Sequence, residues 1–305
     1  MKEEKMKYAI ETNNLVKNFR DVRAVDSVSL RVKQGEIYGF LGLNGAGKTT
    51  TIRALLGMIR PSEGNVKVLG QELGPGGRGP WAQVGYLVES PSAYPELSVK
   101  ENLEVVRRLH GIKNPKVVDD IMEKLAIASY SNRKAGTLSS GNFQRLGLAR
   151  ALMHKPSLLI LDEPVNALDP AGIVEIREMI IRLAREYGMT IFMSSHNLTE
   201  VDKLADRIGI IHKGRLLEEL DADKLDVIRS KQLIVDTRNL VKACAALESF
   251  EVRKLGEHRI AIKDLRAIEA PDAIATLLVN AGSPPYHLAI EQENLEDYFL
   301  KLTAN

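Results

Sequence analysis

The first 220 residues alternate between short apolar runs and longer helical patterns. Apolar runs of the length of buried strands occur at 37–41, 158–161, 190–193 and 208–211. Helices are expected between them at 49–59, where apolar residues recur at i, i+3, i+4 and i+7, and at 171–187. Strands that alternate with helices predict a mostly parallel sheet with both faces covered.

Two further regions accompany this alternation. Strands are expected at 8–10 and 25–32, around a polar loop, and at 65–69, and these predict an N-terminal antiparallel β subdomain. The glycine- and proline-rich stretch 74–80 predicts a loop. From 98 to about 150 the pattern is helical. It opens with a capping box, Ser98 to Glu101, and continues with an apolar stripe at Val118, Ile121, Met122 and Leu125. We expect this block, about 91–155, to be a helical subdomain inserted into the sheet.

The pattern changes beyond about residue 221. Expected strands lie at 232–236, 250–254, 259–263 and 286–290, and expected helices at 240–247, 271–281 and 295–302. The order β-α-β-β-α-β followed by one helix matches the ferredoxin-like arrangement. The chain is therefore expected to contain two domains, residues 1–220 and a small α+β domain of residues 221–305, and the second shows no catalytic constellation.

Composition restricts the function classes. Hydrophobic residues make up 44% and charged residues 27% of the 305, which is typical of soluble globular proteins. The 42 basic and 40 acidic residues nearly balance, so nucleic-acid binding through bulk charge is not expected. The single cysteine, Cys244, fits a reducing compartment. No apolar run approaches the length of a membrane span, so we expect a soluble chain whose membrane role would require a partner.

Residues 42–49 read GLNGAGKT and match the phosphate-loop pattern G-x-x-x-x-G-K-[ST], after an expected strand and before an expected helix. Backbone N–H groups of such a loop face phosphate oxygens, and the helix N-terminus adds partial positive charge. Lys48 is expected to reach the β- and γ-phosphates, and the Thr49 hydroxyl to bind Mg²⁺. A chance glycine-rich turn is the alternative, and the strand–helix context argues against it. The expected nucleotide-binding residues here are Gly42, Asn44, Gly45, Ala46, Gly47, Lys48, Thr49 and Thr50.

Carboxylates and a histidine follow two of the expected buried strands. In LLILDEP, 158–164, Asp162 is expected to hold Mg²⁺ through water and Glu163 to polarise the attacking water. Two solvated acids at a strand end are the alternative. In MSSH, 193–196, His196 is expected to reach the γ-phosphate, although a lone histidine is more often a satisfied polar residue.

Residues 138–142 read LSSGN and stand directly before a helix. Ser139 and Gly141, with the exposed backbone donors behind them, predict a second anion site. A simple helix cap is the alternative. Because the chain already contains one complete phosphate loop, a second anion site is useful when it contacts ATP held by another copy. Two chains arranged head to tail would then enclose two ATP molecules.

Together these motifs resemble the ATP-binding subunits of ABC transporters over residues 8 to about 220. Loop 42–49 corresponds to Walker A, 158–163 to Walker B, 138–142 to the signature, 166–169 (NALD) to the D-loop, and His196 to the switch histidine. Phe19 stands where the family stacks an aromatic ring on adenine; a core aromatic is the alternative. The resemblance implies a P-loop NTPase with a RecA-like core, hydrolysis of ATP with Mg²⁺, a separate integral membrane permease, and a location on the cytoplasmic face of the cell membrane.

The chain departs from the family pattern at three positions. Ser140 and Asn142 replace the usual glycine and glutamine of the signature, while the phosphate contacts, Ser139 and Gly141, are retained. Glu89, in VGYLVES, replaces the usual glutamine and is expected to be a catalytic residue and Mg²⁺ ligand; an ordinary surface acid is the alternative. Glu89, the segment that follows it, and the ending LEDYFLKLT are similar to the bacitracin-resistance and lantibiotic-immunity exporters. This similarity implies export of a peptide antibiotic or a similar amphipathic compound.

Two other functions compete with transport. A non-transport ABC-type ATPase acting on DNA or ribosomes usually carries two cassettes, a coiled-coil insertion or zinc-binding cysteines, and the sequence has none of these. A GTPase would need the guanine-reading N-K-x-D, which is absent, and a P-loop kinase would leave LSSGN without a purpose. Identity of the transported substrate, and of the second cassette, is left open by the sequence.

Overall fold

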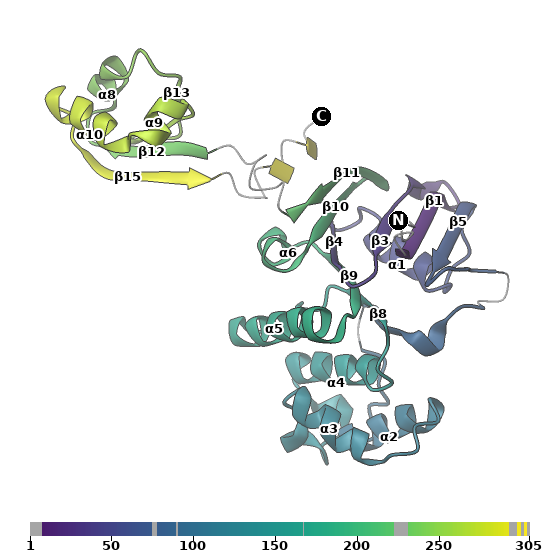
Figure 1. Ribbon diagram of the computed structural model, residues 1–305. Helices are drawn as coiled ribbons and strands as arrows, with labels where there is room; N and C mark the ends of the chain where they lie inside the picture. The colour runs from purple at the N-terminus through teal and green to yellow at the C-terminus, as the bar shows by residue number, and fades with distance from the viewer. Residues whose placement is uncertain are drawn as a thin grey trace, which may run out of the picture. The chain divides into compact units, whose positions relative to one another are not determined.

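The computed structural model describes residues 8–74, 78–89, 91–166, 168–222, 231–292, 298–299 and 302–303. The chain divides into two compact units, residues 1–222 and 223–305 (Figure 1). No helix among the described residues has the length and apolar character that crossing a membrane requires.

A six-stranded sheet forms the centre of the first unit. Its order is β11-β10-β4-β9-β8-β7, and all neighbours are parallel except the edge strand β11. The strands are β4 (Ile37–Leu41), β7 (Val84–Leu87), β8 (Leu158–Asp162), β9 (Thr190–Ser195), β10 (Arg207–His212) and β11 (Arg215–Asp221). Every residue of β4, β8 and β9 is buried, which explains their continuous apolar sequences.

The two faces of this sheet belong to different cores. Leu159, Leu161 and Ile191 pack with α5 (Pro170–Tyr187) and α6 (Leu198–Leu204). Side chains of the opposite face, such as Phe40 and Phe192, pack with α1 (Lys48–Leu55) and with a second, antiparallel sheet. The predicted helix at 49–59 is wrong at its C-terminal end. It stops at Leu55, and Gly57 adopts a left-handed backbone with φ +65°.

The antiparallel sheet has the order β2-β1-β5-β6, with β3 paired to β1. Its strands are β1 (Tyr8–Phe19), β2 (Val22–Val28), β3 (Arg31–Lys33), β5 (Glu63–Val68) and β6 (Gln71–Glu72). The predicted polar loop after residue 10 is wrong, because β1 continues to Phe19. Its middle contains the adjacent exposed residues Asn13 and Asn14, and register shifts interrupt its pairing, so the sequence pattern resembles a loop.

The inserted block consists of three helices that lie next to one another (Figure 1). They are α2 (Val99–Leu109), α3 (Lys116–Lys124) and α4 (Ser140–Leu152), with 3₁₀ turns at Trp81–Gln83, Ala128–Tyr130 and Ala135–Thr137 in and before this region. The predicted capping box is confirmed: the Ser98 hydroxyl accepts from Glu101 N–H, and the Glu101 carboxylate accepts from Ser98 N–H at 2.7 Å. The whole predicted stripe, including Leu125, is buried.

The second unit is a four-stranded antiparallel sheet with helices on one face. Its order, β13-β14-β12-β15, is that of the split β-α-β arrangement, so the predicted fold class is confirmed. The elements are β12 (Lys231–Thr237), α8 (Leu240–Ala246), β13 (Val252–Lys254), β14 (Arg259–Ile262), α9 (Leu265–Glu269), α10 (Pro271–Asn280) and β15 (Pro285–Gln292). Helix α9 was not predicted. The predicted helix at 295–302 lies mostly outside the described residues, as does 75–77 of the predicted loop.

Candidate nucleotide-binding and hydrolysis site

Loop 42–49 joins β4 to α1, and its backbone requires glycine at two positions. Gly47 has φ +106°, and a Cβ there would come within 2.5 Å of the Ala24 carbonyl oxygen. A Cβ on Gly42 would come within 2.5 Å of the Ile211 carbonyl oxygen. Gly47 is also the N-cap of α1 and caps the helix with no side chain, so the first N–H groups of α1 remain accessible to an anion.

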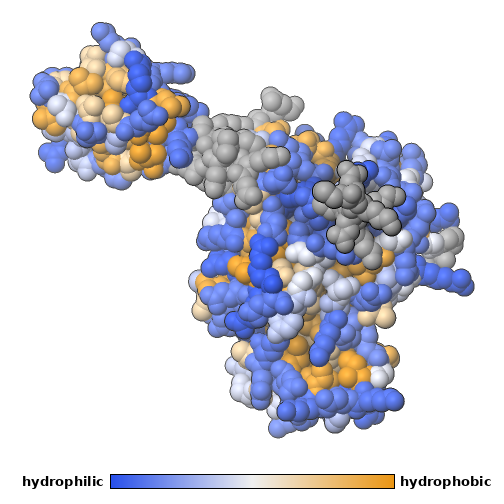
Figure 2. Space-filling model, in the orientation of Figure 1, coloured by the Kyte–Doolittle hydropathy of each residue, from blue (hydrophilic) through white to orange (hydrophobic). Residues whose placement is uncertain are grey.

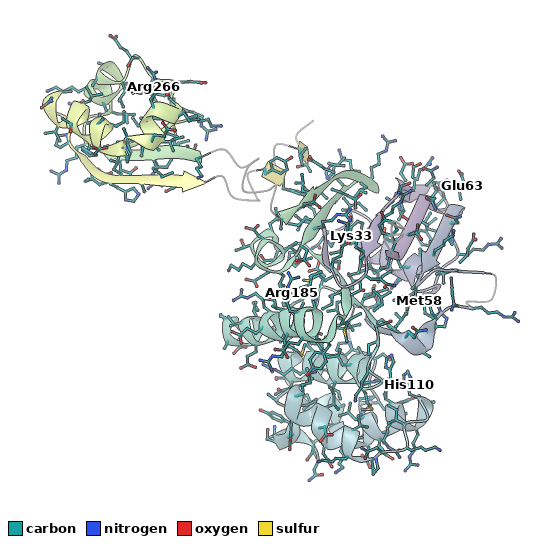
Figure 3. All side chains as sticks on the ribbon, in the orientation of Figure 1. Lys33, Met58, Glu63, His110, Arg185 and Arg266 are labelled. Carbon is teal, nitrogen blue, oxygen red and sulfur yellow. The ribbon has the colours of Figure 1, made fainter. Side chains whose placement is uncertain are left out.

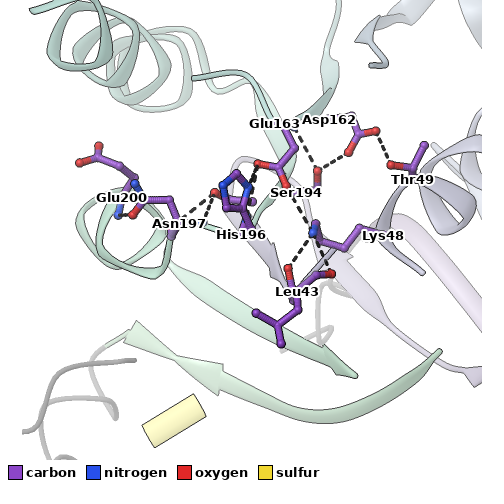
Figure 4. Close-up of polar contacts among 11 residues, drawn as sticks. Leu43, Lys48, Thr49, Asp162, Glu163, Ser194, His196, Asn197 and Glu200 are labelled. Atoms are coloured by element: carbon purple, nitrogen blue, oxygen red, sulfur yellow. Dashed lines mark hydrogen bonds and ion pairs between the residues drawn. The ribbon is translucent and has the colours of Figure 1, made fainter. Parts of the chain in front are cut away.

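Backbone carbonyl groups of the loop hold the Lys48 side chain. Its buried ammonium group donates to the carbonyl oxygens of Gly42 at 2.6 Å and Leu43 at 3.2 Å (Figure 4). The Lys48 nitrogen also lies 3.3 Å from Oε1 of Glu163. The structure therefore brings together the predicted phosphate-binding lysine and the predicted base.

Asp162 is fixed by hydroxyl groups on both of its oxygens. The Thr49 hydroxyl donates to Oδ2 at 2.7 Å, and the Ser194 hydroxyl donates to Oδ1 (Figure 4). Ser194 also accepts the Glu163 backbone N–H at 3.1 Å, and Glu163 has a left-handed φ of +52°. Ser194 was missed by the sequence reasoning. The sequence feature that could have identified Ser194 is a small polar residue at the end of the apolar strand β9, which lies adjacent to β8.

His196 contacts the second oxygen of the Glu163 carboxylate. Its Nδ1 lies 2.8 Å from Oε2 of Glu163, and its backbone N–H donates to the same oxygen at 3.3 Å. Glu163 is mostly buried, whereas the His196 ring is about half exposed. One carboxylate is thus oriented between a lysine and a histidine, an arrangement that can position and polarise a water molecule.

A cavity of about 360 Å³ adjoins loop 42–49. Its walls include Asn44, Thr50 and Glu163, together with the cations Arg23 and Lys213, which the sequence did not single out. Phe19 ends β1 three residues before Val22, another residue of the wall. The Phe19 ring is 45% exposed and has the Lys17 ammonium 4.9 Å from its centroid, so it is a surface aromatic rather than a core residue.

The signature residues lie at the N-terminus of α4, outside loop 42–49. Ser139 is the N-cap, and its hydroxyl accepts from the Asn142 N–H at 3.4 Å. A Cβ on Gly141 would lie 3.3 Å from Leu168 of the predicted D-loop. The buried amide of Gln144, not predicted, donates to the Pro164 carbonyl at 3.1 Å and so ties α4 to the segment after β8. Among the described residues, no hydrogen bond or ion pair joins Ser139 or Gly141 to loop 42–49.

Glu89 lies apart from the Thr49–Asp162 contact. Its carboxylate is 57% exposed and forms an ion pair with Arg53 at 2.7 Å. Arg53 is one helical turn after Thr49 on α1, so this pair places Glu89 beside the helix that begins at the phosphate loop. Glu89 itself has a left-handed φ of +59°.

The fold and this constellation define a P-loop nucleoside triphosphatase with a signature helix. The model of the ABC transporter family matches residues 25–166. The bacitracin transport ATP-binding protein BcrA of Bacillus licheniformis is 40% identical over 299 residues, covering 97% of this chain and 98% of that protein. The lantibiotic transport ATP-binding protein SrtF of Streptococcus pyogenes is 34% identical, covering 75% and 99%. The chain belongs to the ABC transporter family and is an ATP-binding, ATP-hydrolysing subunit, as predicted.

Solved structures agree with this assignment. An ATP-binding subunit of an ABC transporter superposes with a TM-score of 0.65 at 26% identity, covering 72% of this chain and 92% of that one. The cassette MJ0796, in a dimeric post-hydrolysis state bound to ADP and phosphate, also has a TM-score of 0.65. At 22% identity, with 70% and 98% of the chains covered, it supports the fold alone. The DNA- or ribosome-directed alternative finds no support.

Proposed function

We propose that this subunit powers a separate integral membrane permease that exports a peptide antibiotic of the bacitracin or lantibiotic kind. The observation that carries the proposal is the extent of the similarity to BcrA. It spans 97% of the chain and so includes most of residues 223–305, whereas the match to SrtF covers only 75%. A subunit of this kind would work on the cytoplasmic face of the membrane, bound to its permease.

The triphosphate of ATP is proposed to lie over loop 42–49, with adenine stacked on Phe19. The Lys48 ammonium would exchange its contacts with the Gly42 and Leu43 carbonyls for β- and γ-phosphate oxygens. Glu163 would accept a proton from the attacking water, since its carboxylate is already oriented from both sides. His196 would hold that carboxylate and contact the γ-phosphate.

The residues around Asp162 fit Mg²⁺. The Thr49 hydroxyl and the Asp162 carboxylate present oxygen atoms 2.7 Å apart, and oxygen is the ligand that Mg²⁺ prefers. When bound, Mg²⁺ would neutralise charge on the phosphates. Thr49 would contact it directly and Asp162 through water. Glu89 is proposed as a further ligand, which requires the Arg53–Glu89 ion pair to open.

A second copy of the chain is the proposed partner for the signature. The exposed serines and the first N–H groups of α4 would contact the γ-phosphate held by the other copy's loop 42–49. This head-to-tail dimer would enclose two ATP molecules. Each chain would then supply its own phosphate loop, the residues that hold Mg²⁺ and the base Glu163, and its partner would supply Ser139 and Gly141.

The permease is proposed to dock at a cavity of about 350 Å³ between β7, α2 and α4. Its lining includes Tyr86, Val106, Leu109, His110, Arg150 and His154. Figure 3 labels His110 beside the inserted helices, and Figure 2 shows hydrophobic side chains gathered over α2 and α4. Tyr86 and Leu109 are exposed at this site and would pack against an apolar segment of the permease.

Two buried nitrogen atoms at this cavity lack hydrogen-bond partners among the described residues: Nη1 of Arg150 and Nδ1 of His154. Burial lowers the pKa of Arg150. Burial also lowers the pKa of His154, and the stacked His110 ring, 4.1 Å away, lowers it further. Unsatisfied buried polar atoms are costly, so a carboxylate on the docking segment would be stabilising beside Nη1 of Arg150, which is a donor.

The test of the proposed function is made in intact cells. The chain would be expressed with its permease in a bacitracin-sensitive bacterium, beside Glu163→Gln as the inactive control and Arg150→Gln as the docking variant. We expect resistance only with the unchanged chain, and purified Arg150→Gln should keep its basal ATPase but lose permease binding. Equal sensitivity with the unchanged chain and Glu163→Gln, against bacitracin and a lantibiotic alike, would contradict the proposal.

A further inference from the structure

The sheet of residues 231–292 has two very different edges. The edge strand β13 has three residues and carries the exposed cations Arg253 and Lys254. Short, charged edges resist pairing with other chains. The opposite edge strand, β15, has eight residues, and among the described residues it pairs with β12 alone. Its only proline, Pro285, is the first residue, so the rest of the strand can donate backbone hydrogen bonds along the free side.

Apolar side chains line the free edge of β15. Its register with β12 sets Leu288 opposite Val235 and Ile290 opposite Leu233, so both point toward the helix-covered core. Ile290 is nevertheless 47% exposed and Tyr286 60% exposed, and Leu277 of the adjacent α10 is also exposed. Figure 2 shows hydrophobic side chains at the surface of this unit. A long edge with an apolar margin favours pairing with a further strand.

The other face of β15 carries an imidazole and a carboxylate. His287 and Glu291 are four residues apart and therefore share this face. His287 lies opposite Asp236, whose carboxylate is already bound by two hydrogen bonds from Arg259, at 2.7 and 2.8 Å. These bonds hold the pKa of Asp236 below its usual value. Asp236 is thus bound by Arg259, and the His287 ring opposite it, on the edge strand, can also reach a group across the free edge.

We propose that β15 pairs antiparallel with β15 of a second copy of this chain, about a two-fold axis at Ala289. This register sets His287 opposite the other copy's Glu291 and Leu288 opposite its Ile290, each twice. Hydrogen-bonded polar pairs and apolar pairs directly across two strands are stabilising. An axis at Leu288 would instead set His287 opposite Ala289 and lose the pairs of His287 with Glu291. The contact needs no nucleotide, so it goes beyond the ATP-dependent cassette dimer proposed above.

The test uses the full chain, freed of nucleotide, in sedimentation velocity over a range of concentrations. We expect the unchanged chain to dimerise reversibly. Glu291→Lys removes the carboxylate acceptor opposite His287 in both pairs and should weaken the dimer by about tenfold or more, because the cross-strand pairs are lost. Adding His287→Glu should restore the affinity. Arg253→Glu, on the opposite edge strand, is the matched control and should change nothing.

A second measurement does not depend on charge. In a Cys244→Ala background, Ala289→Cys places two thiols opposite each other on the proposed axis. Directly opposed Cα atoms lie about 4.5–5.5 Å apart, within the reach of a disulfide. Tyr286→Cys, in the same background, should not cross-link because its symmetry mate lies far along the strand.

A nucleotide-free chain that stays monomeric would overturn the proposal. So would a dimer that Glu291→Lys leaves intact, a double variant that does not recover, or cross-linking equal at both cysteine positions. ATP binding and the melting temperature of each variant report its folding. Because no nucleotide is present, failure here is distinguishable from failure of the proposed cassette dimer or of transport.

Discussion

Loop 42–49 and the first turn of α4 both present backbone N–H groups at a helix N-terminus, yet their surroundings differ. At the loop, Lys48 is bound to two carbonyl groups, and Thr49 is bound to Asp162, which Ser194 holds in turn. At α4, Ser139 makes one long capping bond, and Ser139 and Ser140 are exposed. The loop is therefore organised within one chain, whereas the α4 site is open toward solvent.

This difference indicates how ATP would control assembly. A site organised in advance can bind nucleotide without a partner. An open site at a helix terminus gains its stabilisation when an anion binds, because the helix dipole then interacts with a charge of opposite sign. We infer that ATP bound to one copy completes the signature site of the other copy, so that two chains share each ATP site.

The largest expected effect is at the loop side, in Glu163→Gln. An amide cannot accept the proton of the attacking water, so hydrolysis should fall by about 10² to 10⁴-fold. ATP binding should persist, because Lys48 and the loop backbone are unchanged, and an ATP-bound dimer should accumulate. Steady-state ATPase and size-exclusion chromatography measure these outcomes. Glu178→Gln, at an exposed acid of α5, is the control. Near-normal hydrolysis in Glu163→Gln would remove Glu163 from the role of base.

At the α4 side, Gly141→Asp should abolish ATP-dependent dimerisation, since its carboxylate would face the partner's γ-phosphate. The matched variant is Gly141→Asn, which has nearly the same size without the charge. Both side chains must displace Leu168 slightly, because a Cβ here lies 3.3 Å from it. We expect Asn to dimerise better than Asp and both to bind ATP as monomers normally. Weakened ATP binding by monomeric Gly141→Asp would assign the signature to the chain's own site.

The smallest effect is expected at Glu89, which lies outside both sites in this structure. Its exposed ion pair with Arg53 is worth about 0–1 kcal/mol. Glu89→Gln should therefore leave basal ATPase within about tenfold, as attraction to Mg²⁺ and repulsion from phosphate oppose each other. Transport per ATP should fall more, because an amide binds metal and water differently. If both Glu89→Gln and Glu89→Ala transport normally in the permease complex, Glu89 is a surface acid.

Sequence patterns were sufficient for the strands that are buried on both faces and for the motifs at their ends. Continuous apolar runs located β4, β8 and β9, and residues at or after their ends are in contact: Thr49 with Asp162, and Lys48 with Glu163. Parallel strands end at one edge of the sheet, so motifs at their ends lie close together.

The remaining features depend on partners distant in sequence. Residues 11–19 form a strand because β2, β3 and β5 pair with β1, which no local pattern reports. Ser194 contacts Asp162 only because β9 pairs with β8. Gln144 looks like an ordinary helix residue until its contact with the Pro164 carbonyl is known. The Arg53–Glu89 pair likewise joins residues from separate elements.

The most direct test of site sharing mixes two defective chains. Lys48→Ala removes the phosphate lysine, and Gly141→Asp removes the signature, so neither should occlude labelled ATP alone. A mixed dimer would combine the intact loop of the Gly141→Asp chain with the intact signature of the Lys48→Ala chain. The account predicts that mixing restores occlusion of labelled ATP at one of the two sites. No occlusion in the mixture, or occlusion by the Gly141→Asp chain alone, would contradict a site built from two copies.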